Sequence, residues 1–234
     1  MAKDVIIALD FPSKEKALTF LDKFEGEEAY VKIGMELFYK EGPEIVREIK
    51  KRGHKIFLDL KIHDIPNTCI GATKSLLNLD VDMINYHAAG GYNMLSGAKG
   101  AIDESGKDVI SLAVTMLTST DEDIMHDELK IDSSLNLEEV VLSYAELTKK
   151  SGLSGIVCSA LEVPKIKEKL GEDFVTVTPG IRKVKNASDD QKRVVTPKEA
   201  RELGSDYIVV GRPITKADDP VKEYKEIKKE FLGE

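Results

Sequence analysis

Residues 55–79 read KIFLDLKIHDIPNTCIGATKSLLNL, and this stretch holds one complete strand-and-helix unit. Its first six residues are mostly apolar or β-favouring, which predicts a strand over Lys55–Leu60. A polar segment follows, and the amphipathic pattern after it predicts a helix over Thr68–Leu79. The same order, a short apolar run and then an amphipathic segment, recurs on both sides of this unit.

The recurring apolar runs predict eight strands. Strands that alternate with helices in this way indicate a parallel sheet with right-handed crossovers. The predicted strands are Val5–Leu9, Tyr30–Ile33, Lys55–Leu60, Met83–His87, Val109–Val114, Gly155–Cys158, Phe174–Thr178 and Tyr207–Val210.

The helical segments carry recognisable ends. Ser13 is placed to cap the first helix, Gly53 and Gly204 follow helical periodicity as carboxyl-terminal caps, and Thr196–Pro197 is typical of a cap and a first helical residue. Pro43 lies inside the second helical pattern, which predicts a kink or a later start there. The predicted helices are Ser13–Phe24, Glu36–Arg52, Thr68–Leu79, Leu137–Lys150, Pro164–Leu170, Pro197–Leu203 and Pro220–Phe231.

Two architectures accommodate eight such units in 234 residues: a closed (β/α)8 barrel and a doubly wound open sheet. No GxGxxG sequence follows the first strand, so the main sign of a dinucleotide-binding open sheet is missing. The length matches a compact barrel, and no linker divides the chain. We therefore predict an α/β fold of the (β/α)8 TIM-barrel type, with residues 1–234 in a single domain.

Composition and charge exclude several classes of protein. Hydrophobic residues make up 41% of the chain and charged residues 32%, and no apolar run is long enough to span a membrane. A formal net charge of −8 argues against a nucleic-acid-binding protein. The amino-terminal apolar run meets Asp10 too early for a signal peptide, and Cys69 and Cys158 are too few for a disulfide framework. We therefore expect a cytoplasmic protein with neither nucleic-acid nor membrane partners.

Polar residues gather where the predicted strands end. In a (β/α)8 barrel, catalytic residues lie at the carboxyl ends of the strands and in the loops that follow them. A charged residue at a single strand end usually belongs to a solvent-exposed edge. Charged residues at five strand ends favour a functional site instead. The residues at or just after the strand ends are Asp10, Lys32, Asp59, Lys61, His63, Asp64, His87, Thr118, Arg182 and Arg212.

The densest group is 59-DLKIHD-64. Side chains alternate along a strand, so Asp59 and Lys61 point to the same face, where Lys32 of the neighbouring strand can reach them. Nearby carboxylates favour the charged form of a lysine, which suits Lys61 to proton donation rather than to Schiff-base formation. The alternative is a salt-bridge network that closes the mouth of the barrel.

The histidines carry weaker signals. We expect His63 to pack or to support the site. The position of His87 suits pocket lining and core packing equally well. We expect His54 and His126 to be structural or solvated.

The loops after the last two strands, 178-TPGIR-182 and 210-VGRPIT-215, resemble a phosphate site. Gly180 and Gly211 allow close approach of the backbone to a ligand, and Arg212 offers a planar fork of donors, with Arg182 able to serve the same anion. The segment 182–195 is long and polar for such a loop, which predicts a lid in which Gln191 folds over the phosphate. The alternative is a disordered surface loop.

These stretches together resemble the orotidine 5′-phosphate decarboxylase family, in its shorter bacterial form. A DxKxxD pattern alone is shared with related phosphosugar barrels, whereas DLKxHDIPNT combined with the two phosphate loops is much more specific. The matching stretches, in order from end to end, are VIIALDF, VKIG, FLDLKIHDIPNT, VTMLTST, TPGIR and VVGRPIT.

The resemblance implies a role for each matching residue. Lys61 would deliver a proton to C6 of the pyrimidine after CO2 leaves, in a charged array with Lys32, Asp59 and Asp64. Asp10 and Lys32 would hold the ribose hydroxyls. The other substrate-binding residues would be Thr118 (with Thr120 as the alternative) at the pyrimidine edge, Pro179 in the pocket wall, and Arg182, Gln191, Gly211 and Arg212 at the phosphate.

The resemblance also implies a homodimer, a nucleotide substrate, and a mechanism with no cofactor and no metal. Asp64, Ile65 and Thr68 would enter the partner's site. Two rival functions remain. Metal-dependent decarboxylases or aldolases of phosphosugars share the barrel, although Lys32 stands where those relatives have a carboxylate. A barrel that binds phosphate without catalysis is the second rival, although such a protein has no need of a proton donor between carboxylates.

Overall fold

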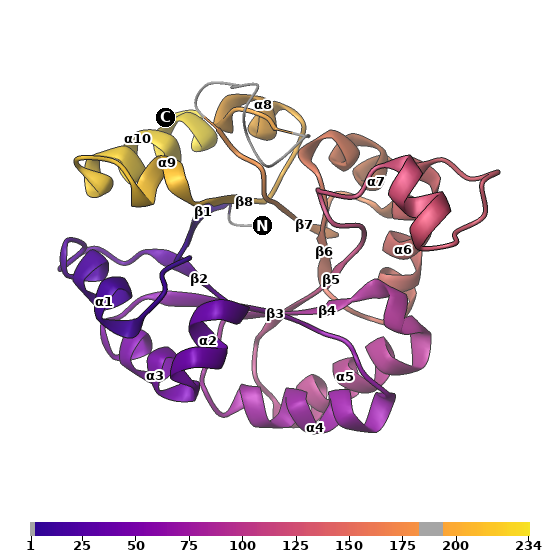
Figure 1. Ribbon diagram of the computed structural model, residues 1–234, viewed down its shortest axis with the longest axis horizontal. Helices are drawn as coiled ribbons and strands as arrows, with labels where there is room; N and C mark the ends of the chain where they lie inside the picture. Colours follow the sequence, from indigo (N-terminus) through magenta and orange to yellow (C-terminus); the bar gives the residue numbers. More distant parts are fainter. Residues whose placement is uncertain (1–2, 183–193) are drawn as a thin grey trace.

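The computed structural model describes residues 3–182 and 194–234 and contains a closed barrel of eight parallel strands (Figure 1), which confirms the predicted fold class. The ring closes where β1 pairs with β8, from Asp4↔Tyr207 to Ile7↔Val210. Two strands match their predicted bounds, and the others differ by one or two residues at one or both ends. The strands are β1 (Asp4–Ala8), β2 (Tyr30–Gly34), β3 (Lys55–Ile62), β4 (Met83–His87), β5 (Ile110–Val114), β6 (Gly155–Val157), β7 (Val175–Thr178) and β8 (Tyr207–Val210).

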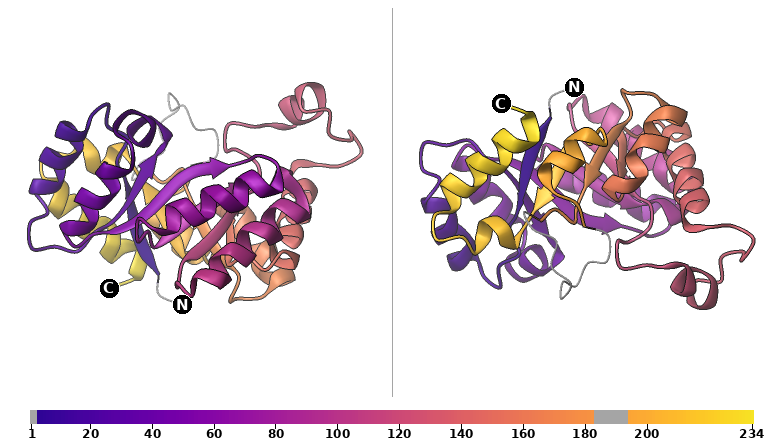
Figure 2. Two further views of the ribbon diagram at one scale, coloured as in Figure 1. Left: turned by 90° about the horizontal axis from the view of Figure 1, so that it is seen from below. Right: turned by 90° about the horizontal axis from the view of Figure 1, so that it is seen from above.

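The helices surround the barrel (Figure 1), and the segment between β5 and α6 projects away from it (Figure 2). Short turns η1 (Ala88–Gly90), η2 (Ile124–Glu128, π-helical) and η3 (Ala160–Glu162) complete the described elements. Among the described residues, none of the helices combines the length and apolar character that a membrane-spanning segment requires. The helices are α1 (Lys14–Asp22), α2 (Met35–Glu41), α3 (Pro43–Lys51), α4 (Pro66–Leu77), α5 (Gly91–Ser105), α6 (Leu137–Lys150), α7 (Val163–Leu170), α8 (Pro197–Glu202), α9 (Arg212–Thr215) and α10 (Pro220–Leu232).

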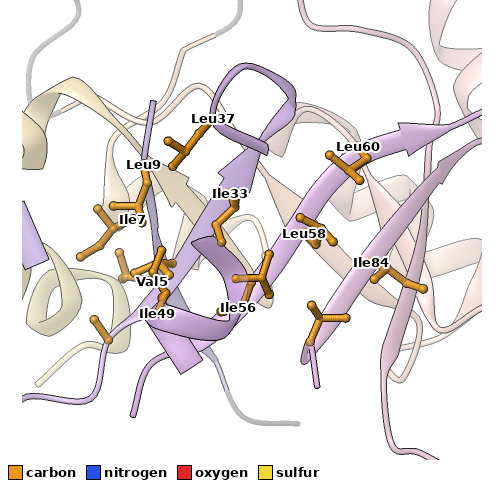
Figure 3. Close-up of a cluster of buried hydrophobic side chains, with 14 of the residues drawn as sticks. Val5, Ile7, Leu9, Ile33, Leu37, Ile49, Ile56, Leu58, Leu60 and Ile84 are labelled. Carbon is orange, nitrogen blue, oxygen red and sulfur yellow. The ribbon is translucent and has the colours of Figure 1, made fainter. Parts of the chain in front are cut away.

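Two apolar layers hold the barrel together, and β1 contributes to both. Val5, Ile7 and Leu9 belong to the buried cluster between the strands and the helices (Figure 3), whereas Ile6 and Ala8 belong to the cluster inside the barrel. This division follows from the two-residue period of a strand. The layer inside the barrel is therefore apolar where Ile6 and Ala8 lie.

The single helix predicted over Glu36–Arg52 is two helices in the structure. Gly42 ends α2 with its N–H bonded to the carbonyl of Phe38, and its φ of 69° turns the chain. Pro43 then begins α3, where its missing N–H costs nothing because first-turn donors have no partner inside a helix. The predicted amino-terminal caps are confirmed: Ser13 accepts from the N–H of Lys16, and Thr196 forms a capping box ahead of Pro197.

Helix α5 was missing from the sequence prediction. Its glycines lower its intrinsic helix propensity, which hid a regular spacing of buried residues. Gly97 has a packing role in α5. A Cβ at this position would lie 3.0 Å from Cδ1 of Ile70 on α4, so a larger residue would crowd the contact between the two helices. The close packing of α4 against α5 therefore overrides the local preference. The buried residues of α5 are Met94, Leu95, Ala98, Ala101 and Ile102.

Candidate active site

A cavity of about 300 Å³ opens at the carboxyl ends of the strands. This volume lies at the lower end of the range for small-molecule sites. Apolar walls come from residues such as Phe57, Val114 and Val209, and charged groups converge at one side. The predicted site residues that line the cavity are Asp10, Lys32, Asp59, Lys61, Thr118, Pro179, Arg182, Gly211 and Arg212.

Four of these side chains form a row of alternating charge. The Lys32 ammonium group lies 3.1 Å from Oδ1 of Asp10 and 3.4 Å from Oδ2 of Asp59. The Lys61 ammonium group lies 2.7 Å from the other oxygen of Asp59. Asp59 therefore joins the two lysines, and Lys61 ends the row at the cavity wall.

Asp59 is held in its charged form by its neighbours. Burial opposes ionisation and by itself would raise the pKa of this carboxyl group. The ammonium groups of Lys32 and Lys61, with hydrogen bonds from Lys61 and Asn85, outweigh burial and hold the pKa of Asp59 below its usual value. A fixed carboxylate thus lies behind the cation that faces the cavity, which is an arrangement suited to stabilising and protonating a carbanion.

Asp59 and Lys61 meet as predicted, but simple alternation along a strand is not the whole reason. Lys61 has a φ of 51°, in the left-handed region that costs an L-residue about 1–2 kcal/mol. The register between β3 and β4 also shifts, because Leu58 pairs with Ile84 but Ile62 pairs with Tyr86. The bulge re-aims Lys61, and such irregularities are common beside active sites.

Asn85 is part of this site, and the sequence analysis missed it. Its side chain, on β4, is buried; it donates to Oδ1 of Asp59 at 2.7 Å and accepts from the backbone N–H of Lys61 at 2.8 Å. The available signal was an amide in the middle of the otherwise largely apolar strand MINYH. A buried amide needs partners, and here both partners are site residues.

None of the four histidines, all in the described part of the chain, lines the cavity. The rings of His63 and His87 stack with centroids 5.4 Å apart, and neither ring lines the cavity. Burial, followed by the influence of His63 and Lys61, lowers the pKa of His87. His54 is buried at the opposite end and accepts the N–H of Ala29, while His126 bonds the carbonyl of Leu135. Both histidines therefore agree with the expectation that they are structural or solvated.

The two loops expected to bind phosphate both contribute to the lining of the cavity. Pro179, Gly180 and Arg182 come from the segment after β7, and Gly211 and Arg212 come from the end of β8. Backbone bonds between Gly180 and Val195 and between Arg182 and Val195 tie the two ends of the long segment together. Gln191, the predicted lid residue, lies outside the described residues.

Thr118 and Thr120 occupy different environments in the structure. Thr118 lines the cavity after β5, as do its neighbours Met116 and Leu117. Thr120 is buried outside the cavity, with its N–H bonded to the carbonyl of Leu117. Of the two alternatives, Thr118 has the position needed to contact a ligand.

Asp64, Ile65 and Thr68 do not line the cavity of their own chain. All three are exposed, Ile65 to 67%, and the Asp64 carboxylate accepts its neighbour's backbone N–H at 2.6 Å. Thr68 lies within α4, which begins two residues earlier than predicted, at Pro66. In residues 3–182 and 194–234, no group of three or more His, Cys, Asp and Glu side chains is arranged to hold a metal ion.

Comparisons with known proteins find relatives of this chain over nearly its whole length. The model of the orotidine 5′-phosphate decarboxylase / HUMPS family matches residues 3–227. An orotidine 5′-phosphate decarboxylase from Bacillus cytotoxicus and one from Bacillus mycoides are each 57% identical, over 100% of this chain and 99% of the relative. The crystal structure of the Lactobacillus acidophilus enzyme of that name has a TM-score of 0.88 at 43% identity, and covers 98% of this chain and 99% of its own.

Proposed function

Because the chain belongs to the orotidine 5′-phosphate decarboxylase / HUMPS family, its reaction is the decarboxylation of orotidine 5′-monophosphate to uridine 5′-monophosphate in pyrimidine biosynthesis, and we propose that Lys61 supplies the proton. One observation carries this proposal. The Lys61 ammonium group lines the cavity while Asp59 holds it at 2.7 Å, so a proton donor is in place before the reaction begins.

In the proposed mechanism, the bond between C6 of the pyrimidine and the carboxyl carbon breaks, CO2 leaves, and the electron pair stays on C6. No adjacent π-system delocalises that pair, so the stabilisation must be electrostatic. Lys61 then donates a proton to C6, and its neutral amine takes a proton from water. The step requires no electron acceptor, and we propose that neither a cofactor nor a metal takes part.

The remaining cavity residues are proposed to bind the rest of the nucleotide. Asp10 and Lys32 hold the ribose hydroxyls, and Thr118 bonds the edge of the pyrimidine. Binding energy from the distant phosphate orients the ring at Lys61. The residues assigned to the pocket wall and the phosphate are Pro179, Arg182, Gly211 and Arg212, with Gln191 from outside the described residues.

We further propose that two copies of the chain share their sites. Asp64, Ile65 and Thr68 are exposed and lie away from their own cavity, which supports their insertion into the site of a partner. An isoleucine exposed to 67% is also a suitable interface residue. Asp64 of each chain would then complete the charged array of the other.

A reducing cytoplasm is the proposed location. Cys69 and Cys158 are both buried and form no disulfide. Oxidising compartments favour disulfides in proteins, so two buried reduced thiols suit a reducing compartment.

The reaction is tested by the ultraviolet absorbance of the purified protein mixed with orotidine 5′-monophosphate, with and without a chelator. We expect conversion to uridine 5′-monophosphate at the same rate in both samples. Conversion that stops with the chelator and returns with added magnesium would contradict the metal-free mechanism. No conversion in either sample would contradict the assigned reaction.

The shared site is tested by mixing two inactive variants, Lys61→Ala and Asp64→Ala. A hybrid dimer contains one site in which both residues are intact, so activity should appear as the subunits exchange. Subunit exchange is followed independently, with a label on each variant. Exchange without any recovery of activity would contradict the shared site and leave the assigned reaction untouched.

A further inference from the structure

The bulge in β3 faces a single residue of β4. Leu58 pairs with Ile84 and Ile62 pairs with Tyr86, so the register leaves Asn85 opposite residues 59–61. Regular ladder bonds between the two strands are interrupted there. A polar side chain at this position therefore stands where backbone groups of β3 need other partners.

Asn85 bonds the backbone of Lys61 directly and reaches its ammonium group through Asp59. Its carbonyl oxygen accepts the Lys61 backbone N–H at 2.8 Å, at the residue whose φ is 51°. Its amide nitrogen donates to Oδ1 of Asp59 at 2.7 Å, and the same oxygen accepts from the Lys61 ammonium group at 2.7 Å. The three residues form a closed ring of hydrogen bonds around the bulge.

An amide suits this position better than the other side chains of its size. The ring requires one donor toward Asp59 and one acceptor toward Lys61, and asparagine has both on one planar group. A leucine would leave the Lys61 N–H unpaired, and an aspartate would present a second carboxylate to Asp59. Asn85 is also buried, so water does not readily replace either bond.

We propose that Asn85 is a positioning residue, which holds the backbone of Lys61 in its left-handed conformation and orients the Asp59 carboxylate that holds the Lys61 ammonium group. The effect on catalysis rests on the function proposed above for Lys61. The effect on the Lys61 backbone does not, because it follows from the hydrogen bonds alone.

The first test replaces Asn85 with alanine and uses Ser111→Ala as the matched control. Ser111 is a buried polar residue of β5 that bonds Ser154 and does not line the cavity. We expect Asn85→Ala to lower kcat about 100-fold, the size expected for a misplaced catalytic group, while the Kd for uridine 5′-monophosphate changes little. Hydrogen exchange of the Lys61 amide should accelerate in Asn85→Ala and not in Ser111→Ala.

The second test is Asn85→Asp, which preserves the shape of the side chain. The groups that face this position are Asp59 and Lys61 on β3, Lys32 on β2 beyond Asp59, and the apolar Leu112 on β5. At high pH the new carboxylate repels Asp59. At lower pH one proton is shared between them, and the protonated carboxyl group again offers a donor and an acceptor. The ratio of variant to wild-type kcat should therefore rise as the pH falls.

The outcomes separate the two proposals. A wild-type kcat that is retained in Asn85→Ala, together with an unchanged exchange rate at Lys61, would overturn the positioning role. If Asn85→Ala does not fold, a kcat ratio for Asn85→Asp that does not rise as the pH falls would overturn it instead. A wild-type protein without turnover would contradict the proposed function, while the exchange rate at Lys61 would still decide the role of Asn85.

Discussion

Two lysine–aspartate ion pairs with the same N–O distance lie at opposite ends of the barrel. Lys61 and Asp59 are 2.7 Å apart at the carboxyl end, and Lys167 and Asp206 are 2.7 Å apart at the amino end. Lys167 also donates to the carbonyls of Glu172 and Phe174, and its side chain is 5% exposed. The Lys61 side chain is 28% exposed and faces the cavity.

The difference lies in how the three N–H donors of each ammonium group are used. Lys167 directs its donors to two carbonyls and a carboxylate, which fixes the turn after α7 and the start of β8. Among the described residues, the Lys61 ammonium group bonds one carboxylate, and Lys61 lines the cavity that a substrate can enter. A saturated pair therefore stabilises the fold, whereas an unsaturated pair is available for chemistry.

The largest expected effect is on activity and follows from Lys61→Ala. Turnover of orotidine 5′-monophosphate should fall about 10⁴-fold or more, because proton donation and electrostatic stabilisation are lost together. Binding of uridine 5′-monophosphate should persist. The matched control is Lys74→Ala, which removes an exposed lysine paired with Glu104 on the surface, and its turnover should stay at the wild-type level.

The next effect is on stability and follows from Lys167→Ala. This variant leaves the Asp206 carboxylate buried without its cation, which typically costs about 3–5 kcal/mol of unfolding free energy. Lys165→Ala breaks an exposed ion pair on the same helix and should cost about 1 kcal/mol or less. Chemical denaturation measures both. Equal losses of unfolding free energy in the two variants would contradict the structural role of Lys167. A loss of kcat in the folded Lys167→Ala protein would contradict the separation between a structural pair at the amino end and a functional pair at the carboxyl end.

The charged group at the carboxyl end was predictable, but its geometry was not, and the Lys167–Asp206 pair at the amino end was not predicted. The strand-end positions of Asp10, Lys32, Asp59 and Lys61 follow from the two-residue period and the parallel topology, and the structure brings all four together. The left-handed backbone of Lys61 and the register shift depend on a partner strand, so the local sequence does not reveal them.

Other features of the fold escaped prediction because they depend on distant contacts. Asn85 acquires its role from a residue 24 positions earlier in the chain. Helix α5 depends on its packing against α4, which its glycines permit although they weaken the local helical signal. Sequence patterns therefore locate the charged groups, whereas the contacts between elements determine how those groups are aimed.

A smaller effect concerns Asp59 of the Lys61–Asp59 pair, whose contribution to the free energy of unfolding depends on pH. The pKa of Asp59 is lower in the folded protein than its ordinary value of about 3.9. Its charge therefore contributes stability above that value, and the contribution is lost as the pH falls through the folded-state pKa. Asp59→Asn should remove this part of the acid-induced loss. Unfolding free energies measured between pH 6 and pH 3 check it, and equal slopes for variant and wild type would contradict it.

The smallest effect concerns His54 at the amino end, where burial and then the nearby Arg52 lower the pKa of the imidazole, against the weaker influence of Glu28. The unfolded chain therefore binds a proton more readily, and stability should decline as the pH falls below about 6.5 toward the folded-state pKa. His54→Asn keeps a neutral acceptor for the N–H of Ala29 and removes the titration. Its unfolding free energy should decline less than that of the wild type between pH 7.5 and pH 5.5. Because this histidine lies far from the cavity, the same substitution should leave the pH profile of kcat unchanged, so a shifted profile would show that the two ends of the barrel are not independent.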